Sequence, residues 1–486
     1  MQLFLRLNSY KKVIFMQKRN YGLFTAITMI TGIVIGSGIF FKADDVLNYA
    51  NQNVWLGVII FVVAAVAVIF GALTISQLAI RTDKPGGLVS YAEDFVGVGA
   101  ATAFGWFESF LYLPTLDAVV AWASGIYVSN LLGFDDFSIT RNTIIGFIAL
   151  TFFFIINTLS AKAGGFFQNF SMIIKIIPLV VLAILGLIKG NTAGVMSGAA
   201  GQAFANSVKG LGFLAAFGPI AFSYDGWIVS TSICHEIKNS KKNLPLALSL
   251  APIGVLIVYL AYFLGVTSFL GAENVTDNAV YEVSTAIFGS MGAKVVLVAV
   301  VISILGTVNG VSLGLIRLPY SMALRNMMPA SKIFKKENKK LGGIPLNSAL
   351  LVYVLSVVYL VINQLVMTSE AKLHFFGKEV AVCNLDISSI AICVLYLTYI
   401  VLYVAVIKLW KKGEIKNVFL GLICPILGTV GSLIIFSGSV VDPVFFIYAL
   451  ICLIFIAIAY IFYKVNKDKI IVESDEEFHS RTDIAE

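Results

Sequence analysis

The residues best suited to bind a small ligand form a glycine-interrupted run, Gly36-Ser37-Gly38, inside the first long apolar segment. Backbone groups freed at a helix break cannot stay unpaired in hydrocarbon, so a break is tolerated only where it lines a protein cavity. The N–H groups of the second half-helix attract an anion, and the C=O groups of the first half attract a cation. A zwitterion uses both ends of such a break.

A second interruption lies in the sixth apolar segment, where Asp225 and Gly226 stand near the centre of an otherwise apolar span. Paired interruptions in corresponding halves of a chain indicate a transporter site near the bilayer midplane. We expect the N–H groups of Ser37 and Gly38 to bind a carboxylate, and the carbonyls of Val34 and Phe222 to bind an ammonium group. The alternative is that these small residues only let helices pack closely. The predicted substrate-binding residues are Val34, Gly36, Ser37, Gly38, Phe222, Ser223, Tyr224, Asp225 and Gly226.

Lys175 stands in the middle of the fifth apolar segment. About ten residues separate it from either end, which at 1.5 Å per residue is roughly 15 Å, further than a lysine side chain reaches. A functional partner is therefore the default expectation. Three roles stay open: organising the site, structural ion pairing, and carrying a proton, since burial penalises the charged form of a lysine.

Two aspartates, Asp117 and Asp225, also lie inside apolar segments. A carboxylate facing the cavity would select a cationic side chain or accept a proton, whereas a hydrogen-bonded acid would stabilise a kink or unwound backbone. For Asp225 we favour local bonding to the backbone. For Asp117, which lies near Pro114, both interpretations stay open, and it is kept as a candidate specificity residue.

The elements that must position these residues follow from composition. The chain has 486 residues, 59% of them hydrophobic and 13% charged, which excludes a soluble globule. Its apolar runs of about 20 to 30 residues suit membrane-spanning helices and are too long for barrel strands. The five cysteines show no metal-binding spacing, and no catalytic arrangement of histidines or carboxylates occurs. We predict an all-α integral membrane protein that is not an enzyme and has no catalytic residues, metal or cofactor.

Twelve apolar segments predict twelve transmembrane helices. The basic residues concentrate in alternate loops, above all at 238–242, 332–340 and 408–416. The positive-inside rule therefore assigns both termini to the cytoplasm, and the formal charge of +7 does not indicate nucleic acid. The segments cover residues 22–50, 54–80, 97–131, 143–160, 165–189, 210–235, 244–271, 293–327, 346–366, 385–409, 417–439 and 443–464.

The two interruptions each open a block of five helices, which predicts a 5+5 inverted repeat with helices 1 and 6 broken. Between helices seven and eight, residues 279–288 form an apolar stretch too short to span a membrane, either a helix over the outer vestibule or an ordinary loop helix. The predicted divisions are a cytoplasmic tail 1–20, a transporter domain 21–465 and an acidic cytoplasmic tail 466–486. Within the domain, repeat one is 22–189, repeat two is 210–410, and helices 11 and 12 lie at 417–464.

Four motifs resemble one family. Residues 32–40 (GIVIGSGIF) resemble the first-helix signature of the amino acid–polyamine–organocation superfamily, close to its L-type amino acid transporter branch. Residues 84–91 (KPGGLVSY), 222–227 (FSYDGW) and 303–310 (SILGTVNG) agree with it. The resemblance covers about residues 20 to 465, and the nearest type is the bacterial serine/threonine exchanger.

This resemblance implies the LeuT-like fold, with the substrate's carboxylate on N–H groups at Ser37 and Gly38 and its amine on carbonyls at Val34 and Phe222. It also implies that the Phe222 ring acts as a thin gate. Family members carry a lysine at the position of Lys175, where sodium-coupled relatives bind an ion. The resemblance thus implies that this ammonium touches carbonyls near Gly32 and the hydroxyl of Ser303.

We therefore expect a multi-pass cell-membrane transporter that moves amino acids by alternating access, through exchange or proton-linked uptake of neutral amino acids. The alternative among transporters is a cationic amino acid or polyamine carrier, because the carboxylates of Asp117 and Asp225 could attract a positive charge. The alternative of another class is a transporter-like nutrient sensor. Eukaryotic exchangers of the family join a glycoprotein through a cysteine near the outer end of helix four. The first cysteine here is Cys234, in the sixth segment, so no disulfide-linked partner is predicted.

Overall fold

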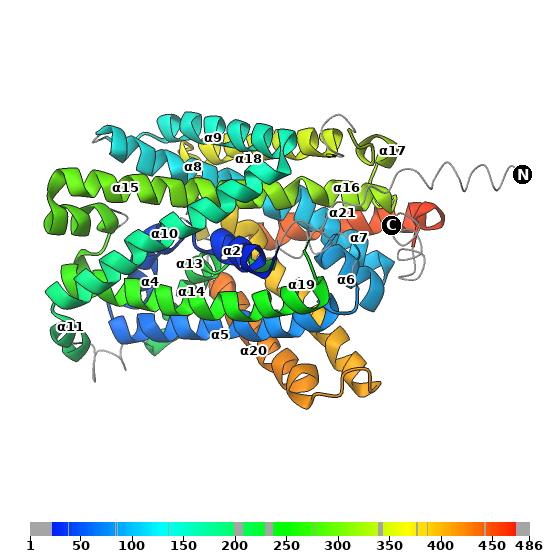
Figure 1. Ribbon diagram of the computed structural model, residues 1–486, viewed down its shortest axis with the longest axis horizontal. Helices are drawn as coiled ribbons and strands as arrows, with labels where there is room; N and C mark the ends of the chain where they lie inside the picture. Colours follow the sequence, from blue (N-terminus) through cyan, green and yellow to red (C-terminus); the bar gives the residue numbers. More distant parts are fainter. Residues whose placement is uncertain are drawn as a thin grey trace, which may run out of the picture.

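The computed structural model describes most of the chain, and its helices pack side by side into one bundle (Figure 1). The predicted tail 1–20, most of the tail 466–486, and Ser37 lie outside the described residues. The structure describes residues 22–36, 38–82, 84, 86–134, 136–198, 208–228, 237–276, 278–338, 344–375, 378–385, 387–441 and 444–472.

In the described part of the chain, ten helices are long and apolar enough to cross a membrane. Each coincides with one of the predicted apolar segments. They are α5 (Val54–Ala79), α7 with η1 and α8 (Val98–Phe107, Glu108–Tyr112 and Leu113–Leu132), α9 (Ile139–Leu159), α10 (Ala161–Lys189), α14 (Ser240–Leu270), α15 (Ala279–Leu315), α18 (Leu346–Met367), α19 (Ile387–Lys411), η7 with α20 (Phe419–Ile423 and Cys424–Val441) and α21 (Phe445–Asn466).

The first and sixth predicted segments correspond instead to shorter helices, and further short helices join the long ones. The short helices are α2 (Leu23–Val34), α3 (Gly38–Phe41), α4 (Ala43–Tyr49), α6 (Leu88–Phe95), α11 (Thr192–Gly198), η2 (Lys209–Ala216), α13 (Phe217–Ser223), η4 (Ala272–Asn274), α16 (Arg317–Leu324), α17 (Ser331–Phe334), η6 (Val382–Asn384) and η8 (Lys467–Lys469). Strands β1 (Lys372–Phe375) and β2 (Lys378–Ala381) form an antiparallel hairpin before α19, the only sheet within the described ranges.

Residues 279–288, the apolar stretch with two open interpretations, form the first turns of α15. Gly289 then turns the chain with a φ of 72° and a ψ of 177°, and the helix continues to Leu315. Glycine is suited to this position because a side chain disfavours positive φ. The stretch is thus a helix joined to the eighth span by a sharp kink.

The third span contains a π-helical turn, η1, because of Pro114. Proline lacks an N–H group, so the carbonyl of Phe110, four residues earlier, loses its helical partner. The Tyr359 hydroxyl of α18 donates a hydrogen bond of 2.9 Å to this carbonyl. The wide turn changes the direction of the side chains before and after it, which matters for the site described below.

Helix α2 lies inside the bundle, where it packs against α10, α14 and α15, and Figure 1 shows it near the middle of the view. The helices α6, α16 and α17 gather at one end of the molecule, and α11 lies at the other. Large apolar side chains such as Ile148 on α9, Leu350 on α18 and Leu453 on α21 are exposed. A belt of exposed apolar side chains on the outer helices is what a lipid-facing surface requires.

Candidate functional site

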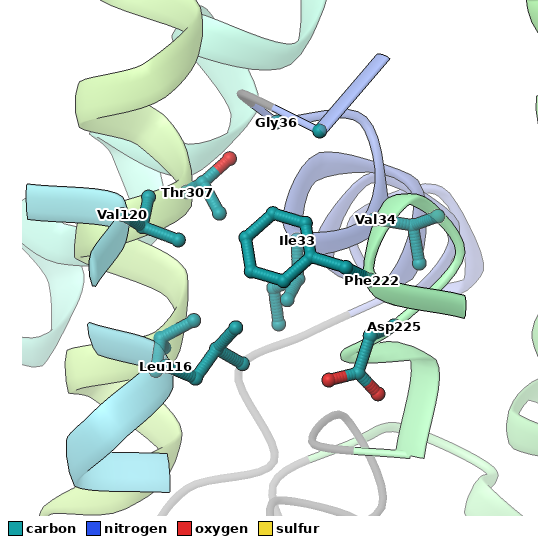
Figure 2. Close-up of a pocket in the computed structure, with 10 residues that line it drawn as sticks. Ile33, Val34, Gly36, Leu116, Val120, Phe222, Asp225 and Thr307 are labelled. Carbon is teal, nitrogen blue, oxygen red and sulfur yellow. The ribbon is translucent and has the colours of Figure 1, made fainter. Parts of the chain in front are cut away.

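A small pocket lies where α2 ends and α13 ends, and α8 and α15 form its opposite wall (Figure 2). Figure 2 shows the Phe222 ring in the middle of the lining side chains, with Asp225 beside it. The pocket is narrow in this conformation: the centre of a water-sized sphere can occupy only about 10 Å³ of it, which is room for about one water molecule. The residues that line it are Ile33, Val34, Gly36, Gly38, Leu116, Val120, Phe222, Asp225, Thr307 and Val311.

Glycines allow the chain segments around this pocket to approach each other closely. A Cβ atom added to Gly36 would lie 2.6 Å from Thr307 Oγ1, and one added to Gly38 would lie 2.8 Å from Ser223 Cα. Gly226 has a φ of 86° and faces the Ile33 side chain. Close packing and a pocket therefore occur at the same place, so the two alternatives for the glycine run, packing and a ligand site, do not exclude each other.

A tyrosine ties the two interruptions together. The Tyr259 hydroxyl of α14 lies 2.8 Å from the carbonyl oxygen of Val34 and 2.9 Å from that of Ser223. One hydroxyl hydrogen cannot serve both oxygens fully, so at least one carbonyl keeps most of its capacity to accept a further hydrogen bond. The Phe222 carbonyl, expected to face a ligand, accepts a hydrogen bond of 3.2 Å from the backbone N–H of Asp225.

Asp225 is bonded both to a side chain and to the backbone. The Tyr112 hydroxyl, at the end of η1, lies 2.8 Å from each carboxylate oxygen, and the backbone N–H of Gly226 also donates to the carboxylate. These bonds are of the kind expected for an acid that stabilises the local structure, and that role of Asp225 stays a prediction. The carboxylate also lines the pocket, so the two interpretations of Asp225 do not exclude each other.

Lys175 is completely buried and reaches the end of α2 from α10. Its Nζ donates hydrogen bonds of 2.6 Å to the carbonyl oxygens of both Gly32 and Ile35, and lies 3.5 Å from Thr307 Oγ1. Ser303 was the expected hydroxyl, but no hydrogen bond joins it to Nζ, and among the described residues its Oγ has no hydrogen-bond partner. Thr307 lies one turn further along the same face of α15 and takes that position.

Asp117 lies outside the pocket lining, although its neighbour in sequence, Leu116, belongs to it. Its carboxylate accepts hydrogen bonds from Ser312 Oγ on α15, at 3.1 and 3.3 Å, and from Ser356 Oγ on α18, at 3.4 Å. These bonds join α8, α15 and α18, so the described contacts of Asp117 are those of a residue that holds helices together.

Of the other predicted residues, Ser223 and Tyr224 are buried beside the pocket but do not line it, and Ser37 lies outside the described residues. Sequence reasoning missed two polar residues, Tyr259 and Tyr112, and the apolar wall from α8 and α15. A buried tyrosine in an apolar helix carries no spacing signal, whereas Pro114 was a usable signal for the irregular turn that ends at Tyr112.

The chain is also similar in sequence to known proteins. A family model described as amino acid permease matches residues 21–468. The serine/threonine exchanger SteT of Bacillus subtilis (strain 168) is 28% identical over 432 residues, which are 87% of this chain and 92% of SteT. The human large neutral amino acids transporter small subunit 2 is 29% identical over 375 residues, 75% of this chain and 69% of that protein.

Among solved structures, the crystal structure of MhsT in complex with L-phenylalanine matches with a TM-score of 0.61. The match covers 85% of this chain and 98% of that chain at 15% sequence identity. At this identity the similarity concerns the fold alone. It places the described helices in a LeuT-like arrangement.

Proposed function

The chain belongs to the amino acid permease family, and from this premise we propose that it exchanges small neutral amino acids across the cell membrane at the pocket between α2, α13, α8 and α15. The family and the relatives make it a multi-pass membrane transporter of amino acids and not an enzyme. The observation that carries the proposal is the pocket itself. The ends of α2 and α13 line one side of this pocket, and apolar side chains of α8 and α15 line the other side.

We propose twelve transmembrane helices in a 5+5 inverted repeat. In this arrangement α2 and α3 are the halves of a broken first helix, and α13 is the first half of a broken sixth. The abrupt end of α2 at Val34 and the restart at Gly38 support this interpretation. The proposed divisions remain repeat one at 22–189, repeat two at 210–410 and two further helices at 417–464, between tails at 1–20 and 466–486.

We propose that the end of the molecule with α6, α16 and α17 faces the cytoplasm, as do both termini. This orientation rests on the concentration of lysine and arginine in the loops at that end, including 332–340. The proposal includes no metal, cofactor or disulfide-linked glycoprotein partner.

For the substrate backbone we propose two contacts. The carboxylate binds the N–H groups at Ser37 and Gly38, where the chain begins a new helix. The ammonium group binds the carbonyls near Val34 and Phe222, with Phe222 as a thin gate above it. The position of Gly38 and Val34 in the pocket lining supports this pairing. Gly32, Lys175 and Thr307 then hold the end of α2 in place, in the role first expected to include Ser303.

For the substrate side chain we propose a small, neutral group, because Leu116, Val120 and Val311 line that part of the pocket. Asp225 supports a second candidate, a cationic amino acid, since a carboxylate in a low-dielectric pocket attracts a positive charge. The hydrogen bonds from Tyr112 and Gly226 already stabilise that carboxylate, which favours the neutral class. SteT is named for serine and threonine, which suggests the first substrates to test.

Exchange predicts that uptake depends on amino acid inside the vesicle. Proteoliposomes loaded with unlabelled serine should take up labelled serine at least about tenfold faster than empty ones. Unlabelled threonine should compete for this uptake, and lysine should not. Equal uptake into empty vesicles would contradict exchange, and competition by lysine would favour the cationic class. Absence of uptake for every amino acid, with protein that elutes as a single folded species, would contradict the proposed function.

Removing the hydroxyl of Tyr259 should weaken substrate binding. Tyr259→Phe loses the hydrogen bond shared by Val34 and Ser223. One such bond contributes about 0.5–1.5 kcal/mol, so we expect the apparent KM for serine to rise roughly three- to tenfold. The matched control is Tyr262→Phe, because Tyr262 is equally buried on the same helix and its hydroxyl bonds no described residue. An unchanged KM in Tyr259→Phe, or an equal rise in both variants, would contradict the role of Tyr259.

A further inference from the structure

A second buried carboxyl group, Glu108, lies near Asp225 in the membrane interior. Glu108 opens the π-helical turn η1 and is 4% exposed. The Tyr112 hydroxyl, at the other end of η1, lies 2.8 Å from both carboxylate oxygens of Asp225, so the two acids belong to one buried cluster. Glu108 Oε2 has no hydrogen-bond partner, and neither carboxyl group forms an ion pair with any residue in the described ranges.

Tyrosine hydroxyls surround this pair. Tyr112, one turn after Glu108, bonds to both oxygens of Asp225. Tyr399 is completely buried on α19, a helix that packs against η1. Tyr396 is buried on the same helix. The hydroxyls of Tyr396 and Tyr399 have no hydrogen-bond partner in the described part of the chain, so unpaired polar groups converge on the two acids.

Two neighbouring carboxylates without a cation cannot both stay ionised in a low-dielectric interior. The surrounding donors decide which of them holds the proton. Asp225 accepts hydrogen bonds from Tyr112 and Gly226, and such bonds stabilise a carboxylate. Glu108 Oε2 receives none, so its neutral form is the less costly one.

We propose that Glu108 and Asp225 together bind one proton, which resides on Glu108 in this conformation, and that amino acid binding in the adjoining pocket releases it. The coupling rests on the proposed function, because it needs an amino acid beside Asp225. An ammonium group arriving there offsets the repulsion between two carboxylates, so it favours the ionised form of Glu108. By linkage, proton binding must weaken amino acid binding by the same factor.

The groups around the pair are mostly tyrosines, whose hydroxyls stay neutral between about pH 5 and 8. The elements packed against η1 contribute tyrosines, Arg317 on α16, Asp117 on α8, and Lys408 and Lys411 in the last turn of α19, whereas α7 contributes no titratable side chain. Asp117 bonds instead to Ser312 and Ser356. The guanidinium of Arg317 bonds to the carbonyl of Leu313, 2.7 Å away. The tyrosines are Tyr224 beside Asp225, Tyr127 on α8, Tyr320 on α16, Tyr353 and Tyr359 on α18, and Tyr396, Tyr399 and Tyr403 on α19.

The test is to add serine to the purified full-length protein in weakly buffered detergent solution and to record proton release with a pH dye. Infrared difference spectra report the protonated carboxyl group directly and exclude Lys175 as the source. We expect proton release and loss of a protonated-carboxyl band in the unaltered protein. In Glu108→Gln, both signals should fall at least about fivefold while serine still binds.

Asp117→Asn is the matched control, because Asp117 is an equally buried acid on the same span but lies outside the pocket lining. Its substitution should leave both signals in place. The proposal is wrong if the signals survive in Glu108→Gln or disappear in Asp117→Asn. If Glu108→Gln fails to fold, Asp225→Asn provides the second test. Without the neighbouring charge, Glu108 should lose its protonated band about one pH unit lower or more, and an unchanged pH would overturn the pairing.

Failure of the proposed function gives a different result. If no amino acid binds, the protonated-carboxyl band of the ligand-free protein can still be titrated with pH in the unaltered protein and in Glu108→Gln. A band that is absent from the variant supports the proton site, whereas identical titrations in both proteins overturn it. Exchange activity that persists without either signal would refute the proton site and leave the transport proposal intact.

Discussion

Replacing Lys175 with methionine will reduce serine exchange by at least about 30-fold. Methionine has similar length but no donor, so the carbonyls of Gly32 and Ile35 lose the ammonium group that now lies 2.6 Å from each of them. An unpaired buried acceptor costs about 1–3 kcal/mol, and two of them cost about 2–6 kcal/mol, where 1.4 kcal/mol is tenfold in an equilibrium. The end of α2, which lines the pocket, should therefore leave its present conformation.

The measurement is the initial rate of labelled serine uptake into serine-loaded proteoliposomes that contain equal amounts of protein. Lys189→Met is the matched control, since Lys189 lies on the same helix, α10, but is exposed at its end. We expect this control to exchange at the unaltered rate. A fully active Lys175→Met would contradict the organising role of the lysine. Loss of folding in that variant, seen as aggregation during size-exclusion chromatography, would instead indicate a role in the stability of the whole bundle.

Gly38→Ala is expected to have the second largest effect on transport. The added Cβ would lie 2.8 Å from Ser223 Cα and 3.2 Å from Phe222 Cδ1. The nearest atom belongs to the backbone of α13, so the helix end must shift to relieve the contact. Overpacking of this kind typically costs about 1–3 kcal/mol. Because both partners of the contact belong to the site, we expect exchange at low serine concentration to fall at least about tenfold.

Gly218→Ala, on α13 itself, is the control for this prediction. A Cβ at Gly218 meets no atom within 4 Å, so this variant should exchange serine normally, and its apparent KM should not change. The serine concentration dependence of exchange distinguishes the causes. A raised KM in Gly38→Ala indicates a distorted site, whereas a normal KM and rate would show that the two interruptions separate easily and do not form one rigid pocket.

Most of the architecture could be predicted from the sequence because the bilayer imposes strong local rules. Apolar segments must be about 20 residues long and their backbones must bond internally. The long helices therefore coincide with the apolar runs, and α2 and α13 end beside the glycine and polar residues of the first and sixth runs. The family motifs lie in the same places, and the family assignment follows from them.

The burial of Lys175 could also be predicted, because its distance from both helix ends is a property of the sequence alone. Its partners could not be predicted in full. Whether Ser303 or Thr307 meets the ammonium group depends on the rotation and axial position of α15 relative to α10 and α2. The rotation and axial position of a helix are set by its packing against helices that are far apart in the chain. The sequence of one helix therefore cannot show which of two hydroxyls, one helical turn apart, meets the ammonium group.

The sequence by itself determined that the chain is a helical membrane protein with glycine or polar interruptions in two apolar segments, and with one lysine and two aspartates inside apolar segments. Only the tertiary structure separated those aspartates, with Asp225 at the pocket and Asp117 between Ser312 and Ser356. The reason is physical: the cost of a buried charge depends on which donors surround it. Those donors come from other helices, and the sequence of one helix does not specify how its neighbours pack against it.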